Sequence, residues 1–164
     1  MSGGGIAIRD AVPGDADALA AMAQEFADEL AALPVSANAP EVPEPDIALT
    51  SDILMRDLFG AEPHAHVLLA EIGGRPAGYL MYHFGYWPAD AAAALHMVDL
   101  FVRLPARRHG VARALIREAG ALLQQKGGRR LIWTVWDQNH AAIAFYRRLG
   151  ARFFAEERLM TLRL

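Results

Sequence analysis

The 164-residue chain contains no cysteine, which excludes disulfide bonds and thiolate-ligated metal sites. Hydrophobic residues make up 54% of it, but many are alanine and no apolar run approaches the length of a membrane span. The first residues also lack the apolar segment of a secretory signal. These absences predict a cytoplasmic protein that does not enter a membrane.

The chain has no excess of positive charge either, since its formal net charge is −3 at pH 7. This balance argues against binding to nucleic acid and is compatible with a small cationic substrate. The histidines at positions 64, 66, 96 and 140 do not combine with acidic residues at metal-ligand spacing, so we predict no metal site.

A chain of this length suits one domain with a single core. We expect residues 1–5 to be flexible and residues 6–164 to form one domain. Alternating and helical periodicities predict the order β-α-α-β-β-β-α-β-α-β-β, an α/β fold with a mixed sheet. The expected strands are 6–11, 66–72, 76–86, 95–102 and 130–136, with a hairpin-like pair in 151–164. The expected helices are 16–30, 46–59, 111 to the glycines at 127–128, and 141–150, with a proline-rich loop at 34–45 and a small-residue connection at 89–94.

The stretch "LPARRHGVARALI" places a cluster of cations where a helix must begin. Helix starts favour acidic or hydroxyl side chains, because their N–H groups are unpaired and carry partial positive charge. Arg107, Arg108 and Arg113 therefore indicate a bound anion, with Gly110 allowing close approach and Ala112 keeping the next turn thin. The alternative is a solvated basic helix start. A P-loop is disfavoured, because the lysine and the Ser or Thr of that motif are missing.

The pattern Arg-x-x-Gly-x-Ala directly after "VDLFV" resembles the acetyl-CoA-binding motif of the GNAT superfamily of N-acetyltransferases. "WTVWDQNHAAIAFYRRLGA" resembles the strand and helix that follow in that superfamily, and the two motifs together cover 95–151. The resemblance implies the GNAT fold, a mixed, mostly antiparallel sheet splayed at its central strand, with helices on both faces.

A narrower resemblance covers about 52–151, where "FGAEPHAHVLLAE", "GYLMYHFGYWP" and "DLFV" are similar to stretches of the diamine and polyamine (spermidine/spermine-type) N-acetyltransferases. It implies transfer of an acetyl group from acetyl-CoA to a primary amine of a diamine, polyamine or lysine-like amino acid, by direct attack in a ternary complex. The alternatives are an aminoglycoside-type or peptide amine as acceptor, or a non-catalytic acyl-CoA-binding module.

The same resemblance implies where the cofactor lies. Its pantetheine arm would pair with the exposed backbone of the central strand like an added strand, and its pyrophosphate would lie on the amides around Gly110. An asparagine would contact the amide arm, beside a helix surface kept low by alanine. The implied cofactor-binding residues are Leu100, Phe101, Val102, Arg107, Arg108, His109, Gly110, Val111, Ala112, Arg113, Asn139, Ala142 and Tyr146.

Tyr146 matches the tyrosine that the superfamily places near the thioester sulfur. A thiol has a reference pKa of about 8.5 and a phenol of about 10, so a neutral tyrosine can protonate the departing thiolate. A backbone N–H near Leu100 would stabilise the oxyanion. The alternative is that Tyr146 is a core aromatic; we expect its neighbour Phe145 to point inward instead.

Asp99 is the only acid in the apolar run "LHMVDLFV", and burying it unpaired would be costly. It therefore has either a structural partner or a role in contacting and deprotonating the amine. Asp99 matches the second acid of an acidic pair in the polyamine enzymes, whereas Val98 replaces the first. This departure leaves water, or an acceptor other than a polyamine, as open possibilities.

Tyr86 and Trp87, together with Tyr82 and His83, are expected to cluster where a strand meets the following loop. They would pack on an aliphatic cation, or form a hydrophobic lid or a dimer interface. Glu25, with Glu29 on the same helix, would attract a cation or lie on a solvated face. The apolar segment 151–164 favours a homodimer, by strand pairing across chains.

Overall fold

The computed structural model describes residues 5–35, 48–154 and 160. The chain divides into two compact units, one formed by 1–32 and 42–134, the other by 33–41 and 135–164. Among the described residues, the first unit contains the sheet and helices α1, α2 and α3, and the second contains helix α4 (His140–Arg148).

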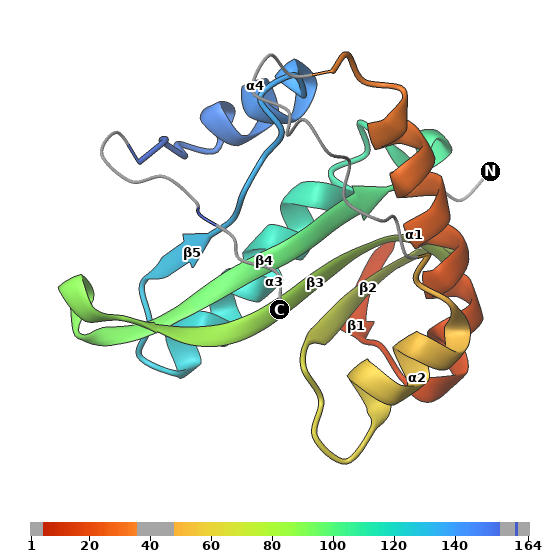
Figure 1. Ribbon diagram of the computed structural model, residues 1–164, viewed down its shortest axis with the longest axis horizontal. Helices are drawn as coiled ribbons and strands as arrows, with labels where there is room; N and C mark the ends of the chain where they lie inside the picture. The colour runs from red at the N-terminus through yellow and green to blue at the C-terminus, as the bar shows by residue number, and fades with distance from the viewer. Residues whose placement is uncertain (1–4, 36–47, 155–159, 161–164) are drawn as a thin grey trace. The chain divides into compact units, whose positions relative to one another are not determined.

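The sheet has five strands in the order β1-β2-β3-β4-β5 (Figure 1). Their bounds are β1 Ile6–Asp10, β2 His66–Ile72, β3 Arg75–Trp87, β4 Ala92–Val102 and β5 Arg130–Ile132. Neighbours from β1 to β4 are antiparallel, and β5 is parallel to β4. The predicted mixed, mostly antiparallel sheet is therefore confirmed.

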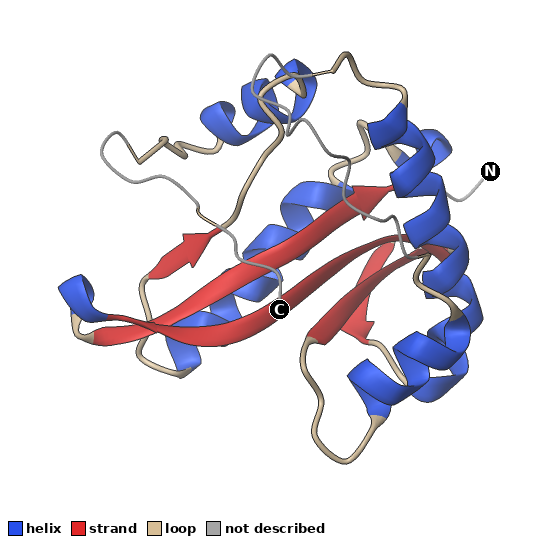
Figure 2. Ribbon diagram, in the orientation of Figure 1, coloured by secondary structure: helices blue, strands red, loops and turns tan. Residues whose placement is uncertain are grey.

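Helices cover both faces of this sheet, as predicted. Helices α1 (Ala16–Ala31) and α2 (Ser51–Phe59) lie on one face, and α3 (Val111–Gln125) crosses the other (Figure 2). Short 3-10 turns occupy Pro13–Asp15, Pro88–Asp90 and Leu104–Ala106. Residues 103–110 connect β4 to α3 and contain the Leu104–Ala106 turn.

The core under α1 and α2 follows from the two periodicities of helix and strand. Leu19 and Met22 from α1 and Leu54 and Leu58 from α2 are buried against alternate residues of the central strands. Those strand residues are Val67, Leu69, Tyr79, Met81 and Phe101. The intervening residues of the strands face α3.

Helix α3 buries Val111, Leu115, Ala119 and Leu123. From the helical spacing of the sequence we expect Val111, Leu115, Ala119 and Leu122 on the inner stripe, and the last of these is wrong. Leu122 is half-buried, whereas Leu123 is 1% exposed. The difference is one position at the last turn, where a spacing of four keeps Leu123 on the core side.

The segment "GGR" between the expected strands 66–72 and 76–86 is typical of a hairpin, and the β2–β3 turn confirms it. Gly73 and Gly74 have φ of 59° and 74°, the two left-handed residues that a tight hairpin requires. On the neighbouring strand β1, Arg9 bonds Asp15 at 2.7 Å and Glu71 of β2 at 2.7 Å. These contacts join the chain before α1 to the first two strands.

Two boundaries differ from the sequence-based expectation in the first unit. The helix expected from Asp46 begins at Ser51, with the Thr50 side chain accepting from the Ile53 amide at 3.4 Å, and Asp46 lies outside the described residues. The expected connection 89–94 is shorter, because β4 already begins at Ala92. Alanine is tolerated there since Ala92 and Ala93 pair with Trp87 and Tyr86 of β3.

The strand expected over 130–136 is also shorter than predicted, because only Arg130–Ile132 pairs with β4. The apolar letters continue to Trp136, but residues 133–136 form no strand. The hairpin expected over 151–164 is not seen in 151–154, and 155–159 and 161–164 lie outside the described residues. The dimer prediction, which rests on that segment, stays a prediction.

Candidate active site

The turn before α3 has the backbone shape of an anion site. Arg108 and Gly110 both have positive φ, 66° and 87°, and Gly110 caps the helix without any side-chain hydrogen bond. The first amides of α3 have no partner inside the helix, so they can point at a ligand. A Cβ on Gly110 would meet no atom within 4 Å, so backbone conformation rather than space requires glycine here.

Side chains around this turn differ in what they can reach. Arg108, His109 and Arg113 are exposed, and Ala112 is half-buried, whereas Val111 is 1% exposed. Val111 therefore packs in the core and can offer a ligand only its amide. The structure brings the predicted phosphate-binding residues into one turn; their contact with a phosphate stays a prediction.

Arg107 is already engaged by the protein. Its Nη2 lies 2.6 Å from Oε2 of Glu29, its Nε donates to the carbonyl of Val102 at 2.7 Å, and its guanidinium lies 5.8 Å from the Phe101 ring centroid. These contacts join α1 to the end of β4. The cations near Gly110 that remain exposed are Arg108 and Arg113.

Strand β4 is paired along its full length on one side only. Residues Ala92–Val102 other than Val98 pair with β3, but β5 pairs only with Ala94, Leu95 and His96. Within the part of the chain that the structure describes, no strand pairs with the β5-facing edge of β4 beyond His96. This edge holds Leu100, Phe101 and Val102 and leads into the Gly110 turn, as expected for a strand that splays from its neighbour.

A β-bulge interrupts β4 on the way to that edge. Tyr82 pairs with Met97 and Met81 pairs with Asp99, so Val98 has no residue opposite it. Val98 is 46% exposed. Bulges re-aim neighbouring side chains and often lie beside active sites. The sequence gives no direct sign of this bulge, because the apolar run is continuous on both sides of it.

Asp99 is half-buried beside the bulge. The Tyr79 hydroxyl donates to its Oδ2 at 3.4 Å. Burial raises the pKa of the Asp99 carboxyl, and the Tyr79 hydrogen bond partly offsets that rise. The structural partner that the sequence left open therefore exists, and the carboxylate is also more basic than an exposed one.

Sequence reasoning missed Tyr79. The residue lies on β3 opposite Phe101, and Asp99 lies two residues before Phe101 on the same face of the sheet. A phenol in an apolar strand is a weak signal by itself, and only the strand register shows which group it meets.

Two acidic residues of α1, Glu25 and Glu29, are paired with arginines that follow β4. Arg103 forms a fork on Glu25, with Nη2 at 2.8 Å and Nε at 3.1 Å, and Glu29 bonds Arg107 as described above. Glu25 was predicted to bind a cationic substrate. Its carboxylate is engaged by Arg103 in the structure, and its role toward a substrate stays a prediction.

Tyr86 and Trp87 do not lie on a loop but end strand β3, so they point to opposite faces. Tyr86 is 66% exposed. Trp87 is stacked by Arg130 at 5.2 Å, and Arg130 bonds Asp90 at 2.8 Å. The expected single aromatic cluster is therefore wrong, because strand alternation separates neighbours in sequence.

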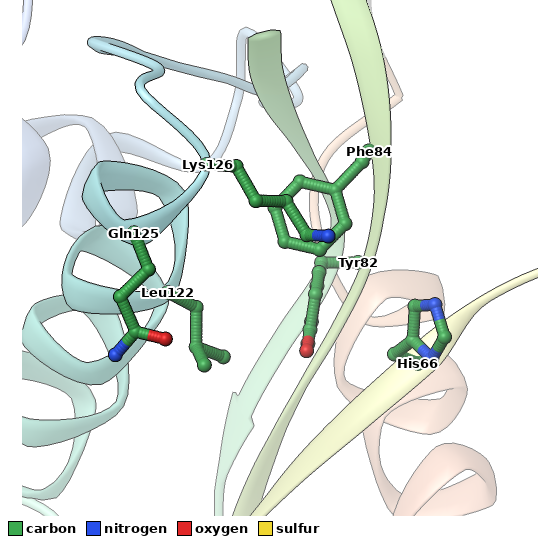
Figure 3. A pocket seen from close by; sticks show the side chains of 6 residues that line it. All are labelled: His66, Tyr82, Phe84, Leu122, Gln125 and Lys126. Carbon is green, nitrogen blue, oxygen red and sulfur yellow. The ribbon is translucent and has the colours of Figure 1, made fainter.

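The other two members of the expected cluster divide in the same way. Tyr82 packs on His66 and Phe84, whereas His83 faces His96 at 4.9 Å. A pocket of about 460 Å³ lies beside Tyr82 and Phe84 (Figure 3). Lys126 reaches over the Phe84 ring at 4.7 Å. It lies at the C-terminal end of α3, whose 15 residues span roughly 22 Å, so it is separate from the Gly110 turn.

The second unit carries the other predicted cofactor contacts. Asn139 caps α4, and its Oδ1 accepts from the Ala142 amide at 3.1 Å. Tyr146 lies one turn beyond Ala142, half-buried, with its ring 5.3 Å from that of Phe145. Phe145 is also half-buried, so neither ring is fully inside. Gly150, at φ 90°, ends the helix as expected.

Among the described residues, no three His, Asp or Glu side chains gather in a group that could hold a metal ion. Within the same residues, no helix combines the length and apolar character needed to cross a membrane.

Comparison with known proteins finds related sequences and a shared fold. The model of the Acetyltransferase (GNAT) family matches residues 24–151. A thialysine N-epsilon-acetyltransferase of Caenorhabditis elegans is 37% identical over 99 residues, which are 59% of this chain and 59% of that protein. The Sus scrofa protein of the same name is 27% identical over 161 residues, 92% of this chain and 86% of that one. An integron cassette protein of V. cholerae has the same fold, with a TM-score of 0.76 at 19% identity, over 96% of this chain and 92% of that chain.

Proposed function

The chain belongs to the Acetyltransferase (GNAT) family of N-acetyltransferases, and we propose that it acetylates the terminal primary amine of a small cationic metabolite. Lysine-like amino acids, diamines and polyamines form the acceptor class. The observation that carries the proposal is the β4 edge, unpaired beyond His96 on the β5 side, leading into the Gly110 turn. That edge and turn match the two halves of acetyl-CoA, an amide-rich arm and a diphosphate.

The cofactor is held mainly by backbone. Its pantetheine arm pairs with the edge at Leu100, Phe101 and Val102, and its diphosphate accepts from the amides that begin α3. Arg108 and Arg113 supply exposed countercharge. The Val102 carbonyl already accepts a hydrogen bond from Arg107. The arm therefore forms its hydrogen bonds mainly with the β4 backbone groups nearer the bulge at Val98. Asn139 and Ala142 are assigned to the arm by the resemblance of their motif alone.

The reaction is a direct transfer in a ternary complex. The neutral amine attacks the acetyl carbonyl carbon, a C–N bond forms, and the C–S bond breaks with departure of the thiolate. Tyr146 gives its proton to that sulfur, and a β4 amide near Leu100 stabilises the oxyanion. The acceptor arrives as an ammonium and loses one proton to Asp99 or to water before the attack. A second N–H proton leaves as the amide forms and returns through water to the Tyr146 phenolate, which balances the step.

Asp99 gives the acceptor site its negative charge. The charge of Glu25 is neutralised by Arg103. Val98 stands where the polyamine enzymes have the first acid of an acidic pair, so it supplies an apolar surface in place of a second negative charge. A single half-buried carboxylate suits one ammonium with an aliphatic chain. The two curated relatives are named for acetylating the Nε amine of thialysine, a lysine-like amino acid, which supports the same class.

An amine panel tests this function. Purified protein is given acetyl-CoA with thialysine, lysine, ornithine, putrescine, spermidine, an aminoglycoside or a short peptide, and free thiol release is followed. We expect the highest kcat/KM among the lysine-like acids and diamines. Turnover with only the peptide or the aminoglycoside would contradict the acceptor class, and no turnover with any amine would contradict the transferase function.

A further inference from the structure

One polar contact is buried in the face of the sheet that α1 and α2 cover. Tyr79 is 1% exposed and lies on β3, and its hydroxyl donates to Oδ2 of Asp99 on β4 at 3.4 Å. Tyr79 is opposite Phe101 in the register, so the contact is diagonal across the strand pair. The contact is longer than the roughly 2.5–3.0 Å usual for an O–H···O bond, and hydrogen bonds at active sites are often long before substrate binds.

We propose that Tyr79 is a positioning residue for Asp99, whose phenol aims the carboxylate and keeps it ionised for a cationic acceptor. The inference rests on the proposed function, because it gives Asp99 the acceptor's ammonium to bind. It assigns Tyr79 no contact with the substrate, since the side chain is almost fully buried.

The phenol is suited to this role because it remains a donor. Burial and the charge of Asp99 raise the pKa of Tyr79 far above neutral pH, so its proton is present throughout the range in which the enzyme works. Burial alone would push the Asp99 carboxyl toward its neutral form, and a neutral carboxyl attracts an ammonium only weakly. Donation from Tyr79 acts in the opposite direction.

Within the described part of the chain, other groups near this face of the sheet do not hydrogen-bond the Asp99 carboxylate. The bulge residue Val98 has no polar side-chain atom, and the α1 acids Glu25 and Glu29 are taken up by Arg103 and Arg107. Among the residues that the structure describes, Tyr79 is the one side chain with a hydrogen bond to Asp99.

The test compares Tyr79→Phe with wild type in the pH dependence of kcat/KM, using the best amine of the panel. We expect the acid limb of the profile, where kcat/KM rises with pH, to move to higher pH in the variant. On that limb kcat/KM should fall about tenfold, and at the alkaline plateau it should fall less than about threefold. Tyr82→Phe is the matched control, because it removes another buried phenol of β3 on the face toward α3. It should leave the profile unchanged. In an Asp99→Asn background, Tyr79→Phe should add no further loss.

A second measurement separates this inference from the function on which it rests. The side-chain carboxyl of Asp99 is titrated by carbon-13 NMR in the free protein, in wild type and in Tyr79→Phe. A higher pKa in the variant, together with the moved limb, supports the proposal, whereas an unmoved carboxyl titration or an unmoved limb overturns it. A wild-type protein that acetylates no amine overturns the proposed function instead, whatever the titration shows.

Discussion

Arg107 bonds Glu29 through Nη2 at 2.6 Å and the Val102 carbonyl through Nε at 2.7 Å. One guanidinium thus joins α1, the end of β4 and the turn before α3. The residue had been predicted from sequence as a countercharge for a phosphate, but in this structure its donors already have protein partners. A charge-assisted bond to a backbone carbonyl is also stronger than an exposed ion pair alone.

Arg107→Met is therefore expected to act on stability. We predict a loss of about 1 kcal/mol in the free energy of unfolding, measured by urea denaturation, with a small effect on CoA affinity. Arg113→Met is the matched variant on the same turn, and it should weaken CoA binding in calorimetry while leaving stability nearly unchanged, because Arg113 is exposed. A larger loss of CoA affinity in Arg107→Met than in Arg113→Met would contradict this assignment.

Gly110 and Gly120 offer a second matched pair within one helix and its cap. Gly110 has φ 87°, whereas Gly120 lies inside α3, and an added Cβ meets no atom within 4 Å at either. Gly110→Ala should cost about 1–2 kcal/mol of stability and weaken CoA binding roughly tenfold, because the amides shift. Gly120→Ala should instead stabilise by about 0.5–1 kcal/mol, since alanine favours helix interiors.

Thermal melts of the Gly110→Ala and Gly120→Ala variants measure the predicted changes in stability, and CoA titrations measure the predicted change in affinity. Equal CoA affinity for Gly110→Ala and wild type would show that the turn is not an anion site.

Tyr146→Phe tests the acid of the proposed reaction. Removing the phenol should lower kcat by roughly a hundredfold, because the thiolate would leave without a proton. CoA affinity should be nearly unchanged, since the aromatic ring remains. Thiol release is measured at saturating amine, beside Tyr82→Phe, which alters the pocket beside α3. An unchanged kcat in Tyr146→Phe would remove the residue from the mechanism.

Local signals in the sequence were sufficient for most elements. The glycine pair at Gly73 and Gly74 predicted the hairpin, and the cations with Gly110 marked the turn before α3, because turn and cap preferences act over a few residues. Helix boundaries at α1 and α4 followed for the same reason. The order of the elements from β1 to α4 was predicted correctly on this basis.

Contacts between distant segments could not be read in this way. Glu25 and Arg103 are 78 positions apart, and the sequence around either residue does not indicate that the two form an ion pair. The bulge at Val98 and the Tyr79–Asp99 contact depend on strand register, which is set by the packing of both faces together. Strand β5 was over-extended for a related reason, since apolar residues after Ile132 suit a strand but find no partner on β4.

The last prediction concerns the stability cost of Asp99. Its pKa is raised in the folded protein above the ordinary value of 3.8, so between those two values the native state binds more protons than the unfolded chain. Stability then falls as pH rises through that window, and the loss persists at higher pH. Asp99→Asn removes the titration, so the variant should be more stable than wild type at pH 8 and about equal to it near pH 3.5.

Asp15→Asn should show the opposite sign. Arg9 lowers the pKa of Asp15, so this acid stabilises the fold above its unfolded pKa of 3.8, and the contribution is lost as pH falls through the folded value. The variant should lose about 2 kcal/mol at pH 8, and the difference should shrink in acid. Urea denaturation of both variants at several pH values decides the matter. A carboxylate kept for function at a cost to stability leaves the protein more stable when it is removed. An Asp99→Asn protein less stable than wild type at pH 8 would therefore contradict the prediction and would mean that the Asp99 charge stabilises the fold.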